Sequence, residues 1–110
     1  MRPLPPPLSD VLERLADGLK ALYRERYQGL VLYGSYARGT ADEGSDVDLL
    51  LLLEGAVNPE REILRIEPVK WPLSLDSGFV LSVLPVSMDA YDRGERLFLR
   101  NARREGFLAA

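Results

Sequence analysis

The chain contains neither cysteine nor histidine. Without cysteine it cannot form disulfide bonds or use a thiolate nucleophile, and without either residue it cannot build the zinc sites or imidazole bases that depend on them. Catalysis by this chain would therefore use carboxylates, hydroxyls and arginines, together with a hard metal ion such as Mg²⁺ that prefers oxygen ligands.

Basic side chains are in the minority, because 14 lysines and arginines stand against 17 aspartates and glutamates, for a net charge of −3. A domain that binds nucleic acid non-specifically normally carries a basic excess, so direct nucleic-acid binding is not expected. The sequence also lacks an apolar run of membrane-spanning length and a signal-peptide pattern at its start. These absences predict a cytoplasmic protein without membrane association.

Prolines dominate the first seven residues, at positions 3, 5, 6 and 7. They predict an extended arm over residues 1–9, followed by a single domain over residues 10–110. Apolar residues at helical spacing predict a first helix over 10–26, capped by Ser9 or Asp10, and residues 27–29 are expected to form a turn.

Further along the chain, helices are expected over 59–67, with Asn58 as cap, and over 88–104, with Ser87 as cap and a break near Gly94. Short apolar runs predict strands over 30–33, 46–53 and 79–86. Five consecutive leucines at 49–53 are typical of a strand that is buried on both faces. The predicted fold class is therefore α/β (α+β), with a mixed sheet of three to five strands flanked by helices.

The residues that can carry chemistry lie between the first two predicted strands. Gly34 lets the backbone approach a ligand closely, and Ser35 adds a hydroxyl at the expected start of a short helix. Asp46 and Asp48 open the next strand, so their side chains should share a face with Cα atoms about 6.6 Å apart. Two carboxylates so placed repel each other unless a cation lies between them, and Mg²⁺ with phosphate oxygens is a natural occupant.

Each half of this pattern has a simpler interpretation when taken alone. A lone Asp-x-Asp is usually a solvated turn or a helix cap, and a lone Gly-Ser is only a turn signal. An EF-hand loop is excluded because Leu49 to Leu53 stand where its glycine and closing glutamate belong. A Walker-type phosphate loop is excluded because the sequence has no Gly-Lys-Ser/Thr. The combination of strand, Gly-Ser, ten residues, Asp-x-Asp and strand is much more specific.

That combination resembles the signature of a known family. Residues 34–49 read Gly-Ser-x-Ala-Arg-Gly-x5-Ser-Asp-x-Asp-Leu, which is similar to the motif of the polymerase-β-type nucleotidyltransferases. The length of the chain, its flanking segments and the ending Leu97–Gly106 resemble the minimal nucleotidyltransferases, which are the antitoxin partners of HEPN-domain proteins in prokaryotic toxin–antitoxin pairs. The resemblance covers residues 10 to 106.

The resemblance implies a nucleotidyltransferase fold and a protein adenylyltransferase activity. In this reading Asp46 and Asp48 are the catalytic and Mg²⁺-binding residues, and Gly34, Ser35 and Arg38 bind the nucleotide. ATP would be the substrate, and AMP would be transferred to a hydroxyl of a HEPN-type ribonuclease toxin. The added charge would silence the toxin by repelling RNA.

Two departures from the family pattern leave alternatives open. Active members usually carry a third carboxylate on the neighbouring strand, which completes a two-metal site, but strand 79–86 contains none. Ser82 occupies a position that could face the aspartates, but a serine cannot replace the charge. Asp76, just before the strand, Asp89, just after it, and Glu43, on the motif loop, are acids that could reach in instead. The chain is also too short to build a closed pocket, so a partner protein or a second copy should supply the missing half.

A second function of a different class follows from the missing acid. The chain would then be a binding module of nucleotidyltransferase fold that neutralises its partner by forming a complex. A purely structural α/β domain ranks third, because it would need no paired aspartates.

Overall fold

The computed structural model describes residues 4–110. Four strands form one sheet in the order β3-β2-β1-β4: β1 (Tyr27–Tyr33), β2 (Val47–Leu53), β3 (Leu81–Ser87) and β4 (Phe107–Leu108). β2 runs parallel to β3, whereas β1 is antiparallel to both β2 and β4. The predicted mixed sheet flanked by helices is therefore confirmed.

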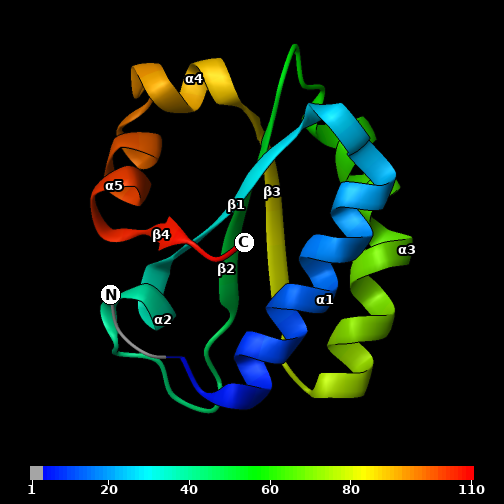
Figure 1. Cartoon of the computed structure of the whole chain (residues 1–110). Coiled ribbons are helices and arrows are strands. Elements are labelled where there is room, and N and C mark those ends of the chain that lie inside the picture. Colours follow the sequence, from blue (N-terminus) through cyan, green and yellow to red (C-terminus); the bar gives the residue numbers. More distant parts are fainter. Residues whose placement is uncertain (1–3) are drawn as a thin grey trace.

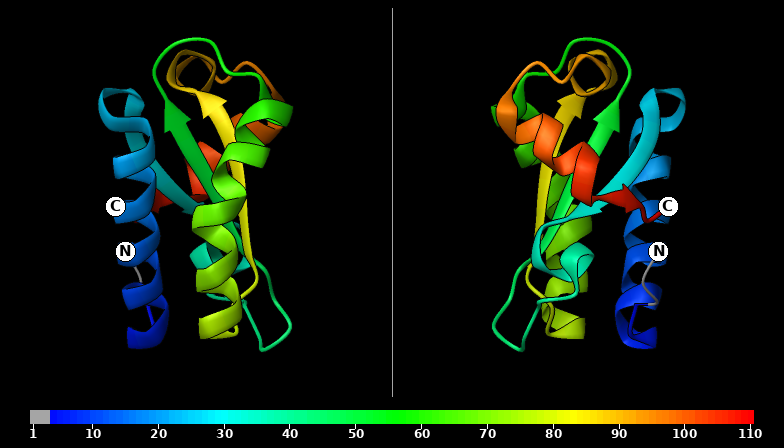
Figure 2. Two further views of the ribbon diagram at one scale, coloured as in Figure 1. Left: turned by 90° about the vertical axis from the view of Figure 1, so that its right-hand side faces the viewer. Right: turned by 90° about the vertical axis from the view of Figure 1, so that its left-hand side faces the viewer.

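Helices cover the two faces of this sheet unequally. The long helices α1 (Pro6–Tyr23) and α3 (Pro59–Ser77) lie side by side over one face, and the short helices α4 (Met88–Arg93) and α5 (Leu97–Glu105) lie on the other (Figures 1 and 2). The remaining helical turns are α2 (Gly34–Arg38) and a single 3₁₀ turn, η1 (Arg24–Arg26). Within residues 4–110, no helix has the length and apolar character needed to cross a membrane.

The core follows the alternation of side chains along β2. Val47, Leu49, Leu51 and Leu53 belong to the main hydrophobic cluster beneath α1 and α3, whereas Leu50 and Leu52 belong to a smaller cluster beneath α4 and α5. All six are at most 2% exposed, so the prediction of a strand buried on both faces is confirmed. Asp48 lies two residues before Leu50 in the strand, so its side chain points to the same face as Leu50 and Leu52, which is the face of α4 and α5.

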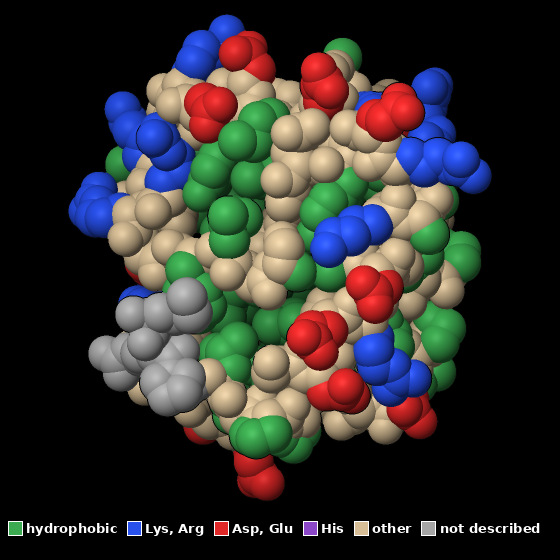
Figure 3. All heavy atoms as spheres, viewed as in Figure 1, with side chains coloured by type: hydrophobic (Ala, Val, Ile, Leu, Met, Phe, Trp, Pro, Cys, Tyr) green, Lys and Arg blue, Asp and Glu red, His purple; other side chains and the backbone are tan. Residues whose placement is uncertain are grey.

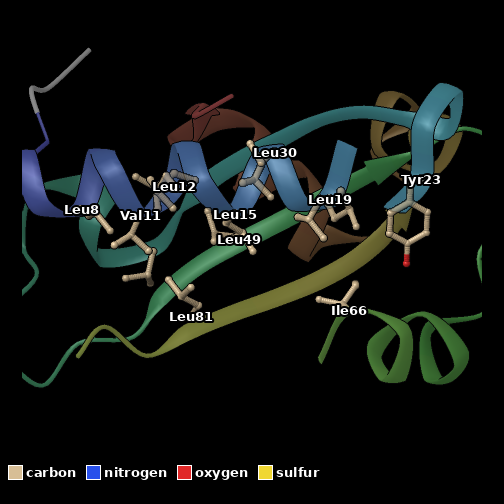
Figure 4. Packing of buried hydrophobic residues seen from close by; sticks show 14 of the residues in the cluster. Leu8, Val11, Leu12, Leu15, Leu19, Tyr23, Leu30, Leu49, Ile66 and Leu81 are labelled. Carbon is tan, nitrogen blue, oxygen red and sulfur yellow. The ribbon is translucent and has the colours of Figure 1, made fainter. Parts of the chain in front are cut away.

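Helix α1 presents one apolar stripe to the sheet, with Leu8, Leu12, Leu15 and Leu19 at its centre (Figure 4). The predicted start at residue 10 is wrong, because the helix begins at Pro6 with prolines in its first turn and no side-chain cap. Proline suits the first helical positions, since their backbone N–H groups have no intrahelical acceptor. The predicted arm over 1–9 is correspondingly shorter, and residues 1–3 lie outside the described residues.

Helix α3 begins as predicted, with the Asn58 side chain accepting a hydrogen bond from the Arg61 amide at 3.2 Å. Its predicted end at residue 67 is wrong, because the helix continues to Ser77 through Pro68 and Pro72. Both prolines lie on the exposed side, where water can solvate the carbonyl groups that their missing N–H groups leave free.

The strands differ from the prediction at their ends. The expected turn at 27–29 is instead the start of β1, where an irregularity in the β1–β2 register lies between Tyr27 and Gly29. The final helical segment is broken at Gly94, as predicted, and the Ser87 side chain caps α4 by accepting from the Ala90 amide at 3.1 Å. Strand β4 was not expected, and it adds the end of the chain to the edge of β1.

Candidate active site

The Gly-Ser turn and the Asp-x-Asp pair meet where β1 ends and β2 begins. Gly34 follows β1 directly and has a φ of +74°, a conformation that favours glycine. A Cβ atom at this position would overlap Oδ2 of Asp48 and would lie 3.1 Å from Cγ of the same carboxylate. Only a glycine therefore lets the turn lie against the Asp48 side chain.

The two aspartates differ in their surroundings. Asp46 lies just before β2 and is exposed, whereas Asp48 is the second residue of the strand and is partly buried. In the sheet, Asp48 is paired with Tyr33 of β1 on one side and with Ser82 of β3 on the other. Ser82 is thus the residue of β3 that lies beside Asp48.

Burial and two neighbouring carboxylates raise the pKa of Asp48, and one arginine opposes them. Desolvation raises the pKa of its carboxyl group above 3.8, the negative charges of Asp46 and Glu105 raise it further, and the Arg38 guanidinium lowers it. Burial, together with the charges of Asp48 and Glu105, raises the pKa of Tyr33 to about 12, so its hydroxyl stays protonated at neutral pH. The site therefore holds negative charge that its own arginine only partly balances.

Glu105 was not identified from the sequence as a residue of this site. It is the last residue of α5, and its Oε1 accepts a hydrogen bond from the Gly34 amide at 3.1 Å. Nη1 of Arg38 donates to both of its oxygens, at 3.2 and 3.1 Å. Arg38 thus lies beside the turn, and its ion-pair partner is Glu105 of α5.

The substitutes considered for the third carboxylate do not lie beside the aspartates. Asp76 is exposed on α3 and pairs with Arg14 of α1, and Asp89 is exposed on α4 beyond the far end of β3. Glu43 is exposed in the loop before β2. Among residues 4–110 there is no group of three acidic side chains close enough to hold a metal ion.

The residues present nevertheless fit one Mg²⁺ ion that is shared with phosphate groups. Mg²⁺ is usually held by one or two carboxylates, with water and phosphate oxygens completing its shell. The raised pKa of Asp48 indicates a carboxylate whose charge is poorly compensated, and a divalent cation would compensate it. Asp46 and Asp48 are the two side chains that would hold it.

An open hollow of about 580 Å³ lies beside the loop that leads to Asp46. The loop 41–45 and the turn 77–80 form its sides, and Tyr36 and Phe79 lie in its wall in an edge-to-face contact of 6.3 Å between ring centroids. Its volume is within the range of ligand pockets. The aspartates themselves do not line this hollow, but Asp46 directly follows its lining residue Ser45.

Comparison with known proteins places this site in a family. The model of the family described as nucleotidyltransferase domain matches residues 12–89. "Putative protein adenylyltransferase MJ1305" of Methanocaldococcus jannaschii is 40% identical over 58 residues, which are 53% of this chain and 38% of that protein. "Putative protein adenylyltransferase MJ0141" of the same organism is 33% identical over 59 residues, which are 52% of this chain and 60% of that protein. The chain therefore spans between about two fifths and three fifths of these relatives.

Solved structures share the fold at low sequence identity. One is described as a toxin-antitoxin with AMP-PNP, with 18% identity, a TM-score of 0.58, and coverage of 86% of this chain and 72% of the other. A second, of the toxin-antitoxin MntA-HpeT, has 17% identity and a TM-score of 0.63, with coverage of 90% and 72%. The family match spans both the Gly34 turn and the Asp46–Asp48 pair, and the chain belongs to the nucleotidyltransferase-domain family.

Proposed function

We propose that this chain transfers AMP from Mg²⁺-bound ATP to a hydroxyl group of a partner protein. The observation that carries the proposal is the direct apposition of the Gly34 turn and the Asp48 carboxylate. A turn that binds phosphates and a carboxylate that binds their metal ion have to be neighbours, and here no side chain separates them. The adenylyltransferase names of the relatives support the same chemistry.

Each site residue has a distinct role in this proposal. Gly34 and Ser35 bind the phosphates through backbone N–H groups and the serine hydroxyl, and Arg38 supplies a positive charge beside them. Asp46 and Asp48 hold Mg²⁺, which neutralises phosphate charge and favours departure of the leaving group when bound. Tyr33, protonated at neutral pH, keeps an O–H group at the edge of the site.

The reaction is a substitution at the α-phosphorus of ATP. The acceptor hydroxyl oxygen forms a bond to that phosphorus, the bond to the β-phosphate oxygen breaks, and pyrophosphate leaves with the bonding electron pair. The hydroxyl proton passes to solvent, because Ser82 rather than a carboxylate stands beside Asp48 on β3. Transfer should therefore be slower than with a dedicated base, by about 10²- to 10⁴-fold.

The acceptor is a protein in this proposal, and we expect it to be a HEPN-type ribonuclease toxin whose activity the added AMP suppresses. Two observations support a protein partner. The structural neighbours are described as toxin-antitoxin complexes. The hollow between the loop 41–45 and the turn 77–80 is open on the surface, so that another molecule would have to close it.

The alternative is a binding module that neutralises its partner without transferring AMP. Ser82 favours it, because it occupies the strand position beside Asp48 where a third acid would complete a two-metal site. The alternative gives no role to the close contact between Gly34 and Asp48.

The test is the mass of a HEPN partner after incubation with this chain, ATP and Mg²⁺. We expect the partner to gain AMP, and the Asp46→Asn/Asp48→Asn double variant to abolish the gain. The matched control is Asp76→Asn/Asp89→Asn, which removes the same charge from exposed positions outside the site. A stable complex without any AMP adduct would instead support the binding module.

A further inference from the structure

The Glu105 carboxylate accepts hydrogen bonds from the same two groups, the Gly34 amide and the Arg38 guanidinium, that bind phosphate in the proposed function. The Gly34 amide donates to its Oε1, and Nη1 of Arg38 donates to both of its oxygens. A backbone amide combined with a guanidinium is a donor set that binds carboxylates and phosphates alike. The Glu105 side chain therefore stands where an anionic ligand of the turn would stand.

We propose that Glu105 is a residue of the nucleotide site that acts as a tethered competitor of the phosphate groups. Nucleotide binding then requires the Glu105 side chain to leave Gly34 and Arg38, which frees both donors for the incoming anion. This inference rests on the proposed function, since it assigns the same turn to the nucleotide.

The charges of the site favour competition over a role in which Glu105 and the nucleotide bind together. Among the described residues 4–110, the carboxylates of Asp46, Asp48 and Glu105 act on this region against one guanidinium, that of Arg38. A triphosphate brings further negative charge, which Glu105 repels when it stays in place. The charge of Glu105 also reaches Asp48, because it contributes to the raised pKa of that carboxyl group.

The main chain around Glu105 is held firmly, so the side chain is the part that moves. The Gly106 amide donates to the Ala102 carbonyl at 2.8 Å, and the next two residues pair with β1. A Cβ atom at Gly106 would lie 2.7 Å from the Leu32 carbonyl oxygen, so the chain passes β1 more closely than a residue with a side chain could. The Glu105 side chain is 29% exposed and can rotate toward solvent while α5 and β4 stay in place.

The test compares the affinity of the wild-type chain, Glu105→Gln and Glu105→Ala for Mg²⁺ with AMP-PNP, measured by calorimetry. Removal of one like charge a few ångströms from the phosphates should tighten binding about five- to twentyfold in both variants. Glu67→Gln is the matched control, because Glu67 is a partly exposed glutamate on α3 that pairs with Lys70, and it should leave the affinity unchanged.

A second readout follows the Gly34 amide itself by NMR hydrogen exchange without nucleotide. Its exchange should be slow in the wild-type chain, in which it donates to Glu105, and faster in Glu105→Ala. Saturation with AMP-PNP should make the two chains alike. This measurement also shows whether the Glu105→Ala chain is folded, because amides of β2 must stay protected.

The outcomes separate this inference from the proposed function. Tighter binding in both Glu105 variants, with Glu67→Gln unchanged, supports the competitor. If the wild-type chain binds nucleotide and the variants bind it equally or more weakly, the proposal that Glu105 competes with phosphate is overturned. The proposed function then still stands. Absence of nucleotide binding in the wild-type chain and in the variants overturns both.

Discussion

Asp48 is the residue at which the electrostatics of the site are concentrated. Because its pKa is raised in the folded chain, the folded state binds a proton at this carboxyl group more tightly than the unfolded state does. The associated stability is therefore complete below the ordinary value of 3.8 and is lost as the pH rises through the higher folded value. At neutral pH the ionised carboxylate destabilises the chain, because it is kept partly buried.

Asp48→Asn removes that charge and should raise the thermal midpoint at neutral pH by about 2 to 4 °C, after allowance for solvent screening. The gain should vanish near pH 3, where the wild-type carboxyl group is protonated as well. Thermal unfolding followed by circular dichroism at both pH values tests this. Asp76→Asn, at an exposed position on α3, should change the midpoint little at either pH. A variant that unfolds at a lower temperature than the wild type at neutral pH would show that the charge of Asp48 is well compensated without a metal ion.

Tyr23 and Glu62 form a buried polar contact between α1 and α3, away from the site. Glu62 is only 4% exposed, and its Oε1 accepts a hydrogen bond from the Tyr23 hydroxyl at 2.7 Å. Tyr23→Phe leaves the buried carboxylate with Arg65 at 3.5 Å as its remaining partner. The substitution should lower the free energy of unfolding by about 1 to 2 kcal/mol.

Urea unfolding measures this change. Tyr91→Phe is the control, because the Tyr91 hydroxyl makes no hydrogen bond within residues 4–110, and it should be nearly neutral. Equal effects of the two substitutions would contradict a stabilising role for the Tyr23–Glu62 hydrogen bond.

At the scale of elements, α3 is the helix in which tertiary packing overrides local propensity. Ile66 is buried against the core, and partly buried Val69 and Leu73 also pack there, so continuing the helix through Pro68 and Pro72 buries apolar surface. An interior proline costs about 3 kcal/mol relative to alanine, and this burial has to offset it. The prolines can be seen in the sequence, but the packing of the helix against the sheet, which compensates for them, cannot.

Pro68→Ala should therefore stabilise the chain by about 1 to 2 kcal/mol, since the restored hydrogen bond outweighs the greater freedom of the unfolded chain. Pro59→Ala is the informative comparison, because Pro59 occupies the first turn of the same helix, where proline is well suited. It should be neutral or mildly destabilising. Urea unfolding of both variants measures the difference, and destabilisation by Pro68→Ala would show that α3 has a bend there that the core requires.

The local motifs of the site were predictable from the sequence, and its long-range contact was not. Three features are local sequence patterns: the apolar runs, the turn at Gly34 and the aspartates at the start of β2. The structure brings them together. The contacts of Glu105 with Gly34 and Arg38 instead cross 71 and 67 residues of chain, so no local pattern contains them. One signal was present, because a glutamate at the C-terminal end of a helix opposes the helix dipole, and Glu105 follows Arg103 and Arg104 there.

At the scale of the whole molecule, the two faces of the sheet are covered to different extents. The long helices α1 and α3 seal one face, while α4 and α5 leave Leu97 62% and Phe98 40% exposed near the other. Asp48 lies on this second face. Figure 3 shows acidic and basic side chains spread around a hydrophobic centre in the view of Figure 1, without one dominant sign of charge. The exposed apolar side chains beside the second face are where we propose that the partner protein contacts the chain.

We propose that the Gly34 turn and the Asp46–Asp48 pair form one metal-dependent nucleotide site. A calorimetric titration of the chain with AMP-PNP, with and without Mg²⁺, measures this directly. We expect one nucleotide per chain, with binding that requires Mg²⁺, weakens at least about tenfold in Asp46→Asn/Asp48→Asn and is unchanged in Asp76→Asn/Asp89→Asn. Equal binding by both double variants, or no binding by the wild-type chain, would contradict it.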